Sequence, residues 1–292
     1  MMHRAFATLG RAANAVKRLL RRLSEPCMAF FTWTASVVTI GILVLIVGFI
    51  LIKGIPHIKP SLFSLSYNSD NVSLLPALIS TVFMTLLSLL IAVPLGLFAA
   101  IYLAEYAGRG NKAVAVIRVT TETLSGIPSI VYGLFGMLFF VTYLGWGYSV
   151  LAGAVTLSMM MLPLIMRASE ETLKAVPDTY REGAFGLGAG KLRTVFRIVL
   201  PSAMPGIFSG VILAIGRIVG ETAALIYTAG TVAQVPTNPM MSARTLSVHM
   251  YALSSEGLHT NEGYATAVVL LVVVVLINTF SASMAKRIGG RA

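Results

Sequence analysis

Long apolar runs alternate with short polar segments along most of the chain. A helix that crosses about 30 Å of hydrocarbon needs roughly 20 predominantly apolar residues. Runs of this kind, bounded by charged or turn-forming residues, lie at 28–52, 75–104, 125–144, 149–166, 205–231 and 264–284. This pattern predicts an all-α integral membrane protein with six transmembrane helices. Three prolines inside these runs are expected to bend their helices: Pro94, Pro128 and Pro163.

The segment ahead of the first apolar run is basic. Its positive charges include Arg11, Lys17, Arg18, Arg21 and Arg22. Because the run that follows is long enough to span, we expect a retained anchor at 28–52 rather than a cleaved signal. Residues 1–27 are expected to form a helix on the anionic lipid surface. Cys27, the only cysteine, allows no internal disulfide; packing is its expected role and lipid attachment the alternative.

The composition agrees with the bilayer as solvent. Hydrophobic residues make up 57% of the chain and charged residues 11%, whereas charged residues are roughly 25% of typical soluble domains. The mean hydropathy is +0.85. The net charge of +11 would favour a nucleic-acid partner in a soluble protein, so the distribution of this charge has to be considered.

Lys and Arg are distributed unevenly between alternate loops. Eighteen of the 22 lie in the two terminal segments and in the second and fourth loops, whereas Lys53, Lys59 and Arg244 are the only ones in the loops of the other side. Cytoplasmic loops collect positive charge, so we expect both termini in the cytoplasm and no nucleic-acid partner. The outer loops at 53–74 and 232–263 are expected to be short ordered caps.

The fourth loop, 167–203, predicts two short helices. Asp178 and Thr179 are candidate N-caps, and Glu182 lies three residues after Thr179 as in a capping box, so a helix should start near Tyr180. Glycines should end it, with Gly188 in the left-handed conformation. A second helix is expected from Lys191 to Leu200, stopping at Pro201.

This loop resembles the signature of ABC importer permeases. The matching residues are Glu182, Gly183, Ala184, Gly188, Ile198, Leu200 and Pro201, with Gly183 in place of the family's alanine as the one departure. The resemblance implies a type I importer permease core at 74–285, in which this loop is the coupling helix that docks on a separate ATPase. The alternative is an ordinary helical connector between two spans.

Nucleotide binding is not expected in this chain. Residues 186–191 look like a phosphate-binding loop, but such a loop needs Gly where Phe185 stands and Ser or Thr where Leu192 stands. We therefore expect no cofactor here, with ATP and Mg bound by the partner ATPase. Catalytic patterns such as His-Glu-x-x-His are also missing, and His249 and His259 lack metal-ligand spacing. The chain is expected to be a transport subunit and not an enzyme.

One arginine lies inside a predicted span. Arg217 near the middle of a bilayer requires a partner or a polar cavity, and Glu221 stands four residues later, one helical turn away. Together with Thr222 they suggest a station for an anion, because guanidinium binds phosphate or sulfate oxygens in bidentate fashion. The alternative is a self-neutralising pair that orients the helix.

Two further arginines lie near the predicted cytoplasmic surface. Arg167, at the inner end of the fourth span, is either a second anion contact on the same route or a positive-inside anchor. Arg118 and Glu122 are four residues apart and are expected to pair with each other on an interfacial helix.

Further runs narrow the resemblance. Residues 124–136, 220–223 and 243–251 are similar to the phosphate-specific permease subunits, closer to the PstA type than to the PstC type. The resemblance implies a PstC-type second permease, a PstB-type ATPase dimer and an external PstS-type phosphate-binding protein, in a bacterial inner membrane. Alternatives are a permease for another oxyanion or a phosphonate, and an anion carrier or channel that works without an ATPase.

Overall fold

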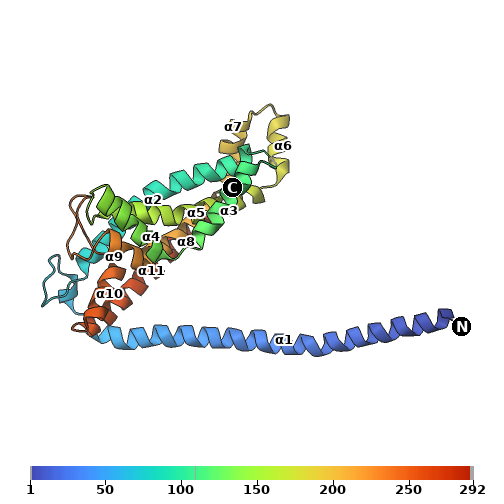
Figure 1. The fold of residues 1–292 in the computed structure, drawn as a ribbon, viewed down its shortest axis with the longest axis horizontal. Coiled ribbons are helices and arrows are strands. Elements are labelled where there is room, and N and C mark those ends of the chain that lie inside the picture. Colours follow the sequence, from blue (N-terminus) through green and yellow to red (C-terminus); the bar gives the residue numbers. More distant parts are fainter. Residues whose placement is uncertain (1, 109, 290–292) are drawn as a thin grey trace. The chain divides into compact units, whose positions relative to one another are not determined.

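Figure 1 shows the computed structural model, which describes residues 2–108 and 110–289, with side chains described for 28–108 and 110–283. Every regular element in these ranges is a helix, which confirms the predicted all-α class. The chain divides into two units, Met1–Ile52 and Lys53–Ala292. The expected lipid contacts of the basic segment and the role of Cys27 concern side chains outside the described set.

The first unit is a single helical rod. Helix α1, Met2–Gly54, contains the first predicted span, and its apolar stretch begins at Met28. The basic segment and the anchor are thus parts of one continuous helix.

Four further spans in the second unit agree at least in part with the apolar runs. Helix α2, Leu75–Ile101, continues through a π-helical segment, η3, Tyr102–Tyr106. Helix α5 covers Val150–Ala175, α8 covers Leu200–Gly220 and α11 covers Thr260–Gly289. In the described residues five helices are long and apolar enough to span a membrane, and the count reaches the predicted six if a bent pair of helices forms one span.

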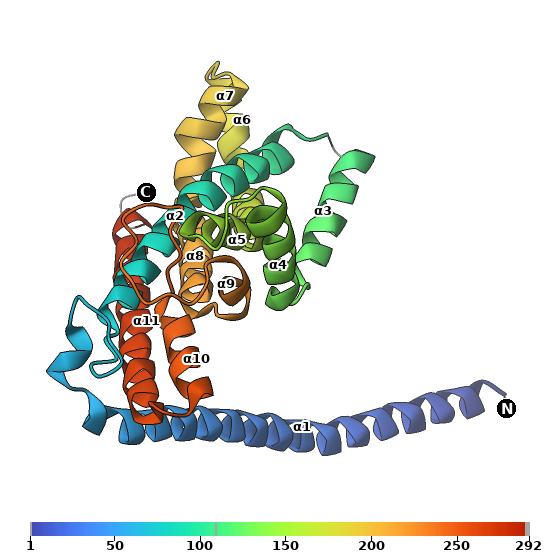
Figure 2. The same cartoon turned by 60° about the vertical axis from the view of Figure 1, so that its left-hand side comes forward.

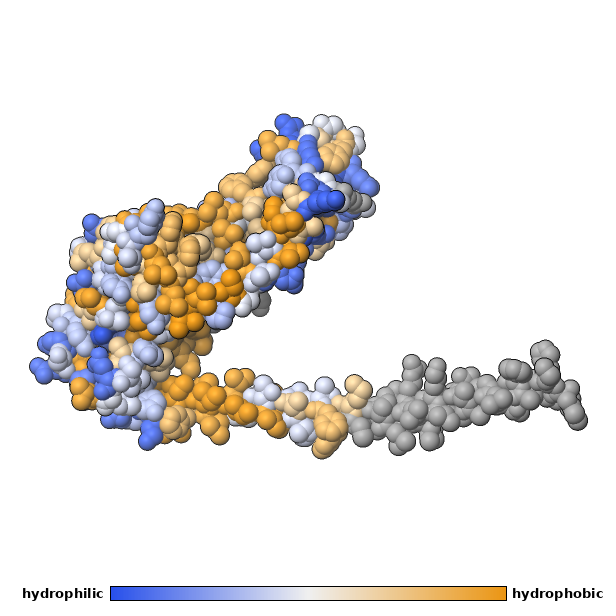
Figure 3. Space-filling model, in the orientation of Figure 1, coloured by the Kyte–Doolittle hydropathy of each residue, from blue (hydrophilic) through white to orange (hydrophobic). Residues whose placement is uncertain are grey.

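Helix α5 is the centre of the bundle. It packs against α2 and α8, and α8 also packs against α11 (Figures 1 and 2). Met84 of α2, Leu157 and Met161 of α5 and Ile218 of α8 are buried together. Small residues such as Ala154 and Ala214 allow the close helix packing that membrane bundles need. Hydrophobic residues cover the middle of the bundle and polar residues its ends (Figure 3).

The bend expected at Pro128 is present, but it separates two helices rather than bending one span at 125–144. Helix α3, Lys112–Ser125, and helix α4, Ser129–Gly136, extended by a π-helical segment η4, Met137–Tyr143, meet at a bend of 98°. Pro128 stands at the break, because proline lacks the N–H that would continue the helix and disfavours a helical conformation at the residue before it. The Tyr132 hydroxyl donates a hydrogen bond to the Leu124 carbonyl across the bend, at 2.9 Å.

The predicted stop at Pro201 was wrong. The helical path runs on from α7, Lys191–Thr194, through a π-helical segment η5, Val195–Val199, into α8, where Pro201 lies in the first turn. Proline is tolerated at such a start because the first-turn N–H has no partner in the helix. The wider π-helical turn ahead of Pro201 lets the helix continue.

The predicted span at 205–231 ends early. Helix α8 stops at Gly220, and a short helix α9, Ala223–Thr228, follows after a break at Glu221 and Thr222. Gly133 of α4 lies against α9, where a Cβ would come within 2.8 Å of the Ala224 Cα. The break turns the chain so that α9 packs on α4.

The two ends of the second unit carry different short helices. One end holds α6, Asp178–Gly186, and α7, and the other holds α10, Leu246–Glu256, in both ribbon views. The first outer loop forms the short helices η1, Ile55–His57, and η2, Pro60–Phe63, in keeping with an ordered cap. Helix α10 in the second outer loop was not predicted.

Candidate functional site

Residues 178–194 form a sharp turn of two short helices, which we call the α6–α7 elbow. Gly188 has a φ of +82°, the left-handed conformation that the sequence predicted there and that glycine adopts at little cost. Helix α6 begins after Pro177 without a side-chain cap, so the predicted capping box of Thr179 and Glu182 is not formed. Pro177 at the boundary fixes the start of the helix instead.

The outer surface of the elbow is apolar and exposed. Leu187 is 91% exposed at its tip, and Phe185 and Leu192 are also exposed. A groove of about 410 Å³ beside the tip is lined by Ala184, Leu187, Ala189, Arg193, Arg197 and Ile198. Exposed apolar side chains outside the membrane-spanning part of a protein mark contact surfaces, so the elbow has the character of a docking surface.

The signature residues are arranged around this surface. Glu182, Gly183 and Gly188 are exposed, whereas Ala184 is buried. Ile198 and Leu200 are half-buried, and the Ile198 carbonyl accepts a hydrogen bond of 2.7 Å from the Ser202 hydroxyl. Pro201 is exposed at the start of α8. The elbow is thus continuous with a membrane-spanning helix on its C-terminal side.

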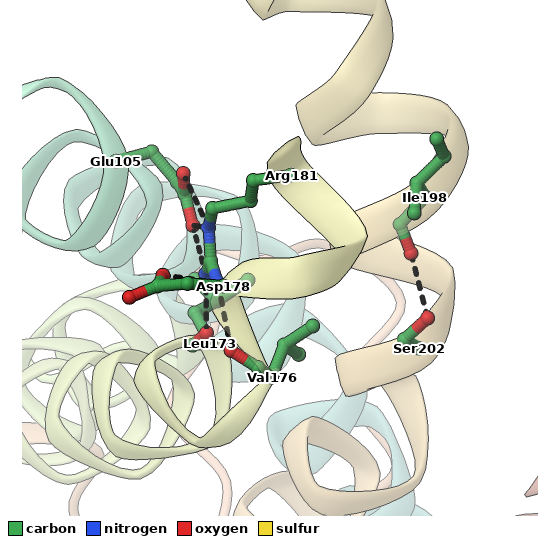
Figure 4. Close-up of polar contacts among 7 residues, drawn as sticks. All are labelled: Glu105, Leu173, Val176, Asp178, Arg181, Ile198 and Ser202. Carbon is green, nitrogen blue, oxygen red and sulfur yellow. Dashed lines mark hydrogen bonds and ion pairs between the residues drawn. The ribbon is translucent and has the colours of Figure 1, made fainter. Parts of the chain in front are cut away.

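A buried ion pair fixes the elbow to η3, at the end of the α2–η3 span (Figure 4). Arg181 Nη2 lies 2.6 Å from Glu105 Oε1, and the two side chains are 15% and 7% exposed. Arg181 also donates to the carbonyls of Leu173 at 2.9 Å and Val176 at 2.7 Å, at the end of α5. One guanidinium therefore joins α6 to both η3 and the end of α5, in a setting where the charged groups have hydrogen-bond partners.

A second contact adds to this attachment. The Lys191 ammonium of α7 lies 4.9 Å from the ring centroid of Tyr106, and Tyr106 is the last residue of η3. Both arms of the elbow thus touch the same end of the α2–η3 span.

The second candidate site is the break between α8 and α9. The carboxylate of Glu221 accepts the Ala224 N–H at 3.1 Å, as a cap of α9, and its main-chain carbonyl accepts a hydrogen bond of 2.6 Å from the Ser247 hydroxyl. Thr222 lies in the break beside it. The break is therefore held by α9 and by the start of α10.

The expected pairing of Arg217 with Glu221 is not formed. Glu221 lies beyond the end of α8 in an extended conformation, so the two residues do not share a helical face, and they make no ion pair. Arg217 is instead exposed on α8. The self-neutralising alternative is excluded for this conformation, which leaves a charged guanidinium exposed on a spanning helix.

Arg167 belongs to a network of charges between α3 and α5. Its guanidinium lies 3.0 Å from Glu171 and 3.6 Å from Glu122. Arg118 lies 2.7 Å from Glu170, so the expected pairing of Arg118 with Glu122 was wrong; each pairs with α5. These side chains line a cavity of about 210 Å³. The network clasps the bent α3 to α5, and Arg167 is already engaged by carboxylates.

The sequence reasoning missed Glu105, Glu170 and Arg181. Glu105 is the only charged residue between 75 and 106, which could have marked it as a group with a specific partner. Arg181 precedes the signature residue Glu182 directly, but nothing local predicted its burial. Among the side chains that the structure describes, no group of three or more His, Cys, Asp or Glu is placed to hold a metal ion.

Residues 92–292 match the family described as binding-protein-dependent transport system inner membrane component. The matched range covers most of the chain and includes the elbow, the break at Glu221 and all the helices from α3 onward. The chain belongs to this family. It is accordingly a multi-pass permease subunit of an ABC importer, as the signature at 182–201 predicted.

Named relatives cover most of the chain. A probable ABC transporter permease protein YqgI of Bacillus subtilis is 36% identical over 69% of this chain and 74% of its own length. A phosphate transport system permease protein PstA 1 of Mycobacterium tuberculosis is 38% identical over 70% of this chain and 68% of its own length. The predicted resemblance to PstA-type permeases is thereby confirmed.

A solved structure agrees in fold. The structure of a bacterial alginate ABC transporter in complex with an alginate-bound periplasmic protein contains a chain with a TM-score of 0.66, at 16% identity, covering 89% of this chain and 95% of that one. At this identity the similarity shows the fold, which is the predicted permease fold of type I ABC importers.

Proposed function

We propose that this chain is the PstA-type permease subunit of an ATP-driven importer of inorganic phosphate. It forms part of the anion pathway and transmits the movements of a separate ATPase to that pathway. The chain carries out no covalent chemistry, and ATP and Mg bind to the ATPase. The single observation that carries the proposal is the exposed apolar elbow, which is fixed through Arg181 to the end of a spanning helix.

The elbow has the properties that a coupling element requires. Its tip, with Leu187 91% exposed, offers apolar area to a partner subunit. Its base is held by the Arg181–Glu105 pair and by two carbonyls at the end of α5. A partner that moves the tip therefore moves α2 and α5 as well. Discrete movement of this kind between two packed states is how closure of an ATPase can alter access to a pathway.

The anion specificity rests on Arg217 and on the named relatives. Arg217 is exposed on a spanning helix and makes no ion pair with any described side chain, and an isolated arginine in a membrane is stable only next to water, an anion or a partner group. The name of the Mycobacterium tuberculosis relative specifies phosphate transport. We assign Arg217 and Thr222 to the pathway, with Glu221 holding the break that shapes it.

The same proposal assigns the role of Arg167. Its two carboxylate partners, Glu122 and Glu171, are both exposed, so an incoming oxyanion can compete with them. Arg167 would then receive the anion near the end of the bundle that carries the elbow. The distribution of Lys and Arg supports a cytoplasmic position for that end, with both termini on the same side.

The proposed assembly contains a PstC-type permease, two copies of a PstB-type ATPase and a PstS-type phosphate-binding protein. The alternatives are import of another oxyanion or a phosphonate by the same assembly, and transport without any ATPase. An ATPase-independent carrier has no use for an exposed docking elbow, so the elbow favours the coupled assembly.

Co-purification of the ATPase tests this proposal. Leu187→Asp places a charge at the apolar tip and should remove the ATPase from the purified permease. Leu258→Asp is the matched control, because Leu258 is 82% exposed but lies between α10 and α11, at the other end of the unit. The control should retain the ATPase. Retention of the ATPase by both variants would overturn the docking role of the elbow.

A further inference from the structure

A buried arginine lies at the end of the bundle opposite the elbow. Arg244 is only 6% exposed, and its Nε and Nη2 atoms are buried without a hydrogen-bond partner. No carboxylate in the described part of the chain forms an ion pair with it. A buried charge without a counter-charge is costly, so a site of this kind indicates a missing anionic group.

The two unpartnered atoms lie on one edge of the guanidinium. The N–H groups of Nε and Nη2 point in parallel, and this is the edge that binds two oxygens of a carboxylate or phosphate together. The flat face of the Arg244 guanidinium lies against an aromatic ring, since its Cζ atom is 4.5 Å from the centroid of the Tyr67 ring. The aromatic ring supports the cation and leaves the donor edge free.

A histidine completes this cluster. His249 of α10 is fully buried, neither ring nitrogen has a hydrogen-bond partner, and its ring stands perpendicular to that of Tyr67 with centroids 6.1 Å apart. Burial, and secondarily the charge of Arg244, lowers the pKa of His249 to about 3. The imidazole is therefore neutral at physiological pH and has one N–H to donate. We call Arg244, His249 and Tyr67 the Arg244 cluster.

The Arg244 cluster is linked to the break in the pathway by short contacts. Thr245, next to Arg244, has its hydroxyl 3.0 Å from that of Ser247, and the Ser247 hydroxyl donates to the Glu221 carbonyl at 2.6 Å. The Arg244 N–H donates to the Val232 carbonyl at 3.0 Å, which fixes the loop that follows α9. These hydrogen bonds connect the Arg244 cluster to the break at Glu221, which lies between Arg244 and Arg217 in the chain.

We propose that the Arg244 cluster is a second oxyanion-binding site, at the external end of the pathway. This inference rests on the proposed function. It adds a site at which the anion is held before it passes the break at Glu221. The occupant is a small oxyanion rather than a carboxylate of a docked protein, because the two donor atoms are buried below the surface. Tyr67, which is half-buried, holds the guanidinium by its face and keeps the donor edge turned toward the bound anion.

The decisive variant is Arg244→Met in the complete transporter. Methionine fills similar apolar space and removes the unpaired charge, so the complex should assemble normally and resist heat as well as wild type or better. At the same time the KM for phosphate should rise by about tenfold or more, because the bidentate contact is lost. Lys59→Met, which removes an exposed charge from the outer loop at 53–74, is the control and should keep the wild-type KM.

A purely structural arginine gives the opposite result. In that case Arg244→Met lowers the thermal stability or the yield of the complex, and the molecules that do assemble transport with an unchanged KM. That outcome would overturn the proposal. If the wild-type complex transports phosphate and only the KM effect is missing, this inference fails while the proposed function stands. If the wild-type complex does not transport phosphate, the proposed function itself fails.

A binding measurement identifies the source of the anion. Inorganic phosphate at millimolar concentration should raise the thermal denaturation temperature of the wild-type complex without the binding protein, and should have a smaller effect on the Arg244→Met complex. Stabilisation that appears only with the binding protein present, with no effect of phosphate alone, would identify a protein carboxylate as the occupant and contradict the proposed small oxyanion.

Discussion

Glu105, at the end of the α2–η3 span, and Arg181, in the elbow, form a buried ion pair with 2.6 Å between Oε1 and Nη2. The pair joins residues 76 positions apart in the chain. Because Arg181 also donates to two carbonyls at the end of α5, one side chain connects the elbow to two spanning helices.

Glu105→Gln should uncouple the transporter. The amide leaves the buried guanidinium without its counter-charge, and breaking a buried pair on one side costs about 3–5 kcal/mol. We expect the ATPase to remain bound and to hydrolyse ATP, while phosphate uptake falls strongly. Parallel assays of ATP hydrolysis and uptake in proteoliposomes measure this.

Asp178→Asn is the matched control for that variant. Asp178 is also an ion-pair partner of Arg181, at 3.2 Å, but its side chain is 73% exposed, and exposed pairs contribute about 0–1 kcal/mol. Uptake by this variant should be close to wild type. Equal losses in Asp178→Asn and Glu105→Gln would show that the buried pair has no special role in coupling.

Two glycine substitutions in the elbow should have opposite effects on its stability. Gly188→Ala forces a side chain into a backbone with φ of +82° and should weaken the elbow by about 1 kcal/mol, with reduced uptake. Gly183→Ala restores the family's alanine in helix α6, where a Cβ meets nothing within 4 Å. It should stabilise the helix by about 0.5–1 kcal/mol and leave uptake unchanged. Uptake rates and the proteolytic resistance of the loop measure both effects.

Acid should destabilise the outer end through His249. Its folded-state pKa of about 3 lies below the ordinary value of 6.5, so below pH 6.5 the unfolded chain takes up a proton that the folded chain does not. The contribution of the neutral His249 to the free energy of unfolding is fully present above pH 6.5. It is lost progressively as the pH falls toward 3, by about 1.4 kcal/mol per pH unit. Arg244 and Tyr67 are the charged and titratable groups that face the ring. The backbone of Val72 offsets part of the shift without forming a hydrogen bond of good geometry.

The measurement is thermal denaturation of the purified complex at pH 7.5 and pH 5. His249→Gln should reduce the drop in denaturation temperature between the two values. His259→Gln, whose side chain is 31% exposed, should keep the wild-type drop. If His249→Gln keeps the full drop as well, the buried imidazole is not the acid-sensitive group.

The spans could be predicted because they depend on hydropathy summed over about 20 residues. Their breaks depend on single residues and were predicted only in part. Pro128 was expected to bend a helix and in fact separates two helices at 98°. At Glu221 the helical path ends and the side chain caps α9. The position of this break depends on the packing of α9 against α4, which hydropathy does not indicate.

The long-range partners of the charged residues could not be predicted. Spacing of four residues suggested pairing of Arg118 with Glu122 and of Arg217 with Glu221. In the fold both Arg118 and Glu122 find closer partners on α5, and Arg217 has none among the described carboxylates. The turn of the elbow at Gly188 was predicted, because a glycine with positive φ is a local feature, whereas the predicted capping box is not formed. The attachment of the elbow through Glu105 arises only when η3 and α6 come together in the fold.

ATP-driven phosphate uptake by proteoliposomes with Arg217 variants tests the central claim most directly. The complete transporter with its binding protein should accumulate phosphate when ATP is supplied inside, and excess sulfate should compete poorly. Arg217→Gln, inserted and assembled normally, should lose most of this uptake, because the pathway loses its exposed cation, and Arg217→Lys should keep a measurable part. ATP-dependent phosphate uptake by the Arg217→Gln transporter at the wild-type rate would contradict the account.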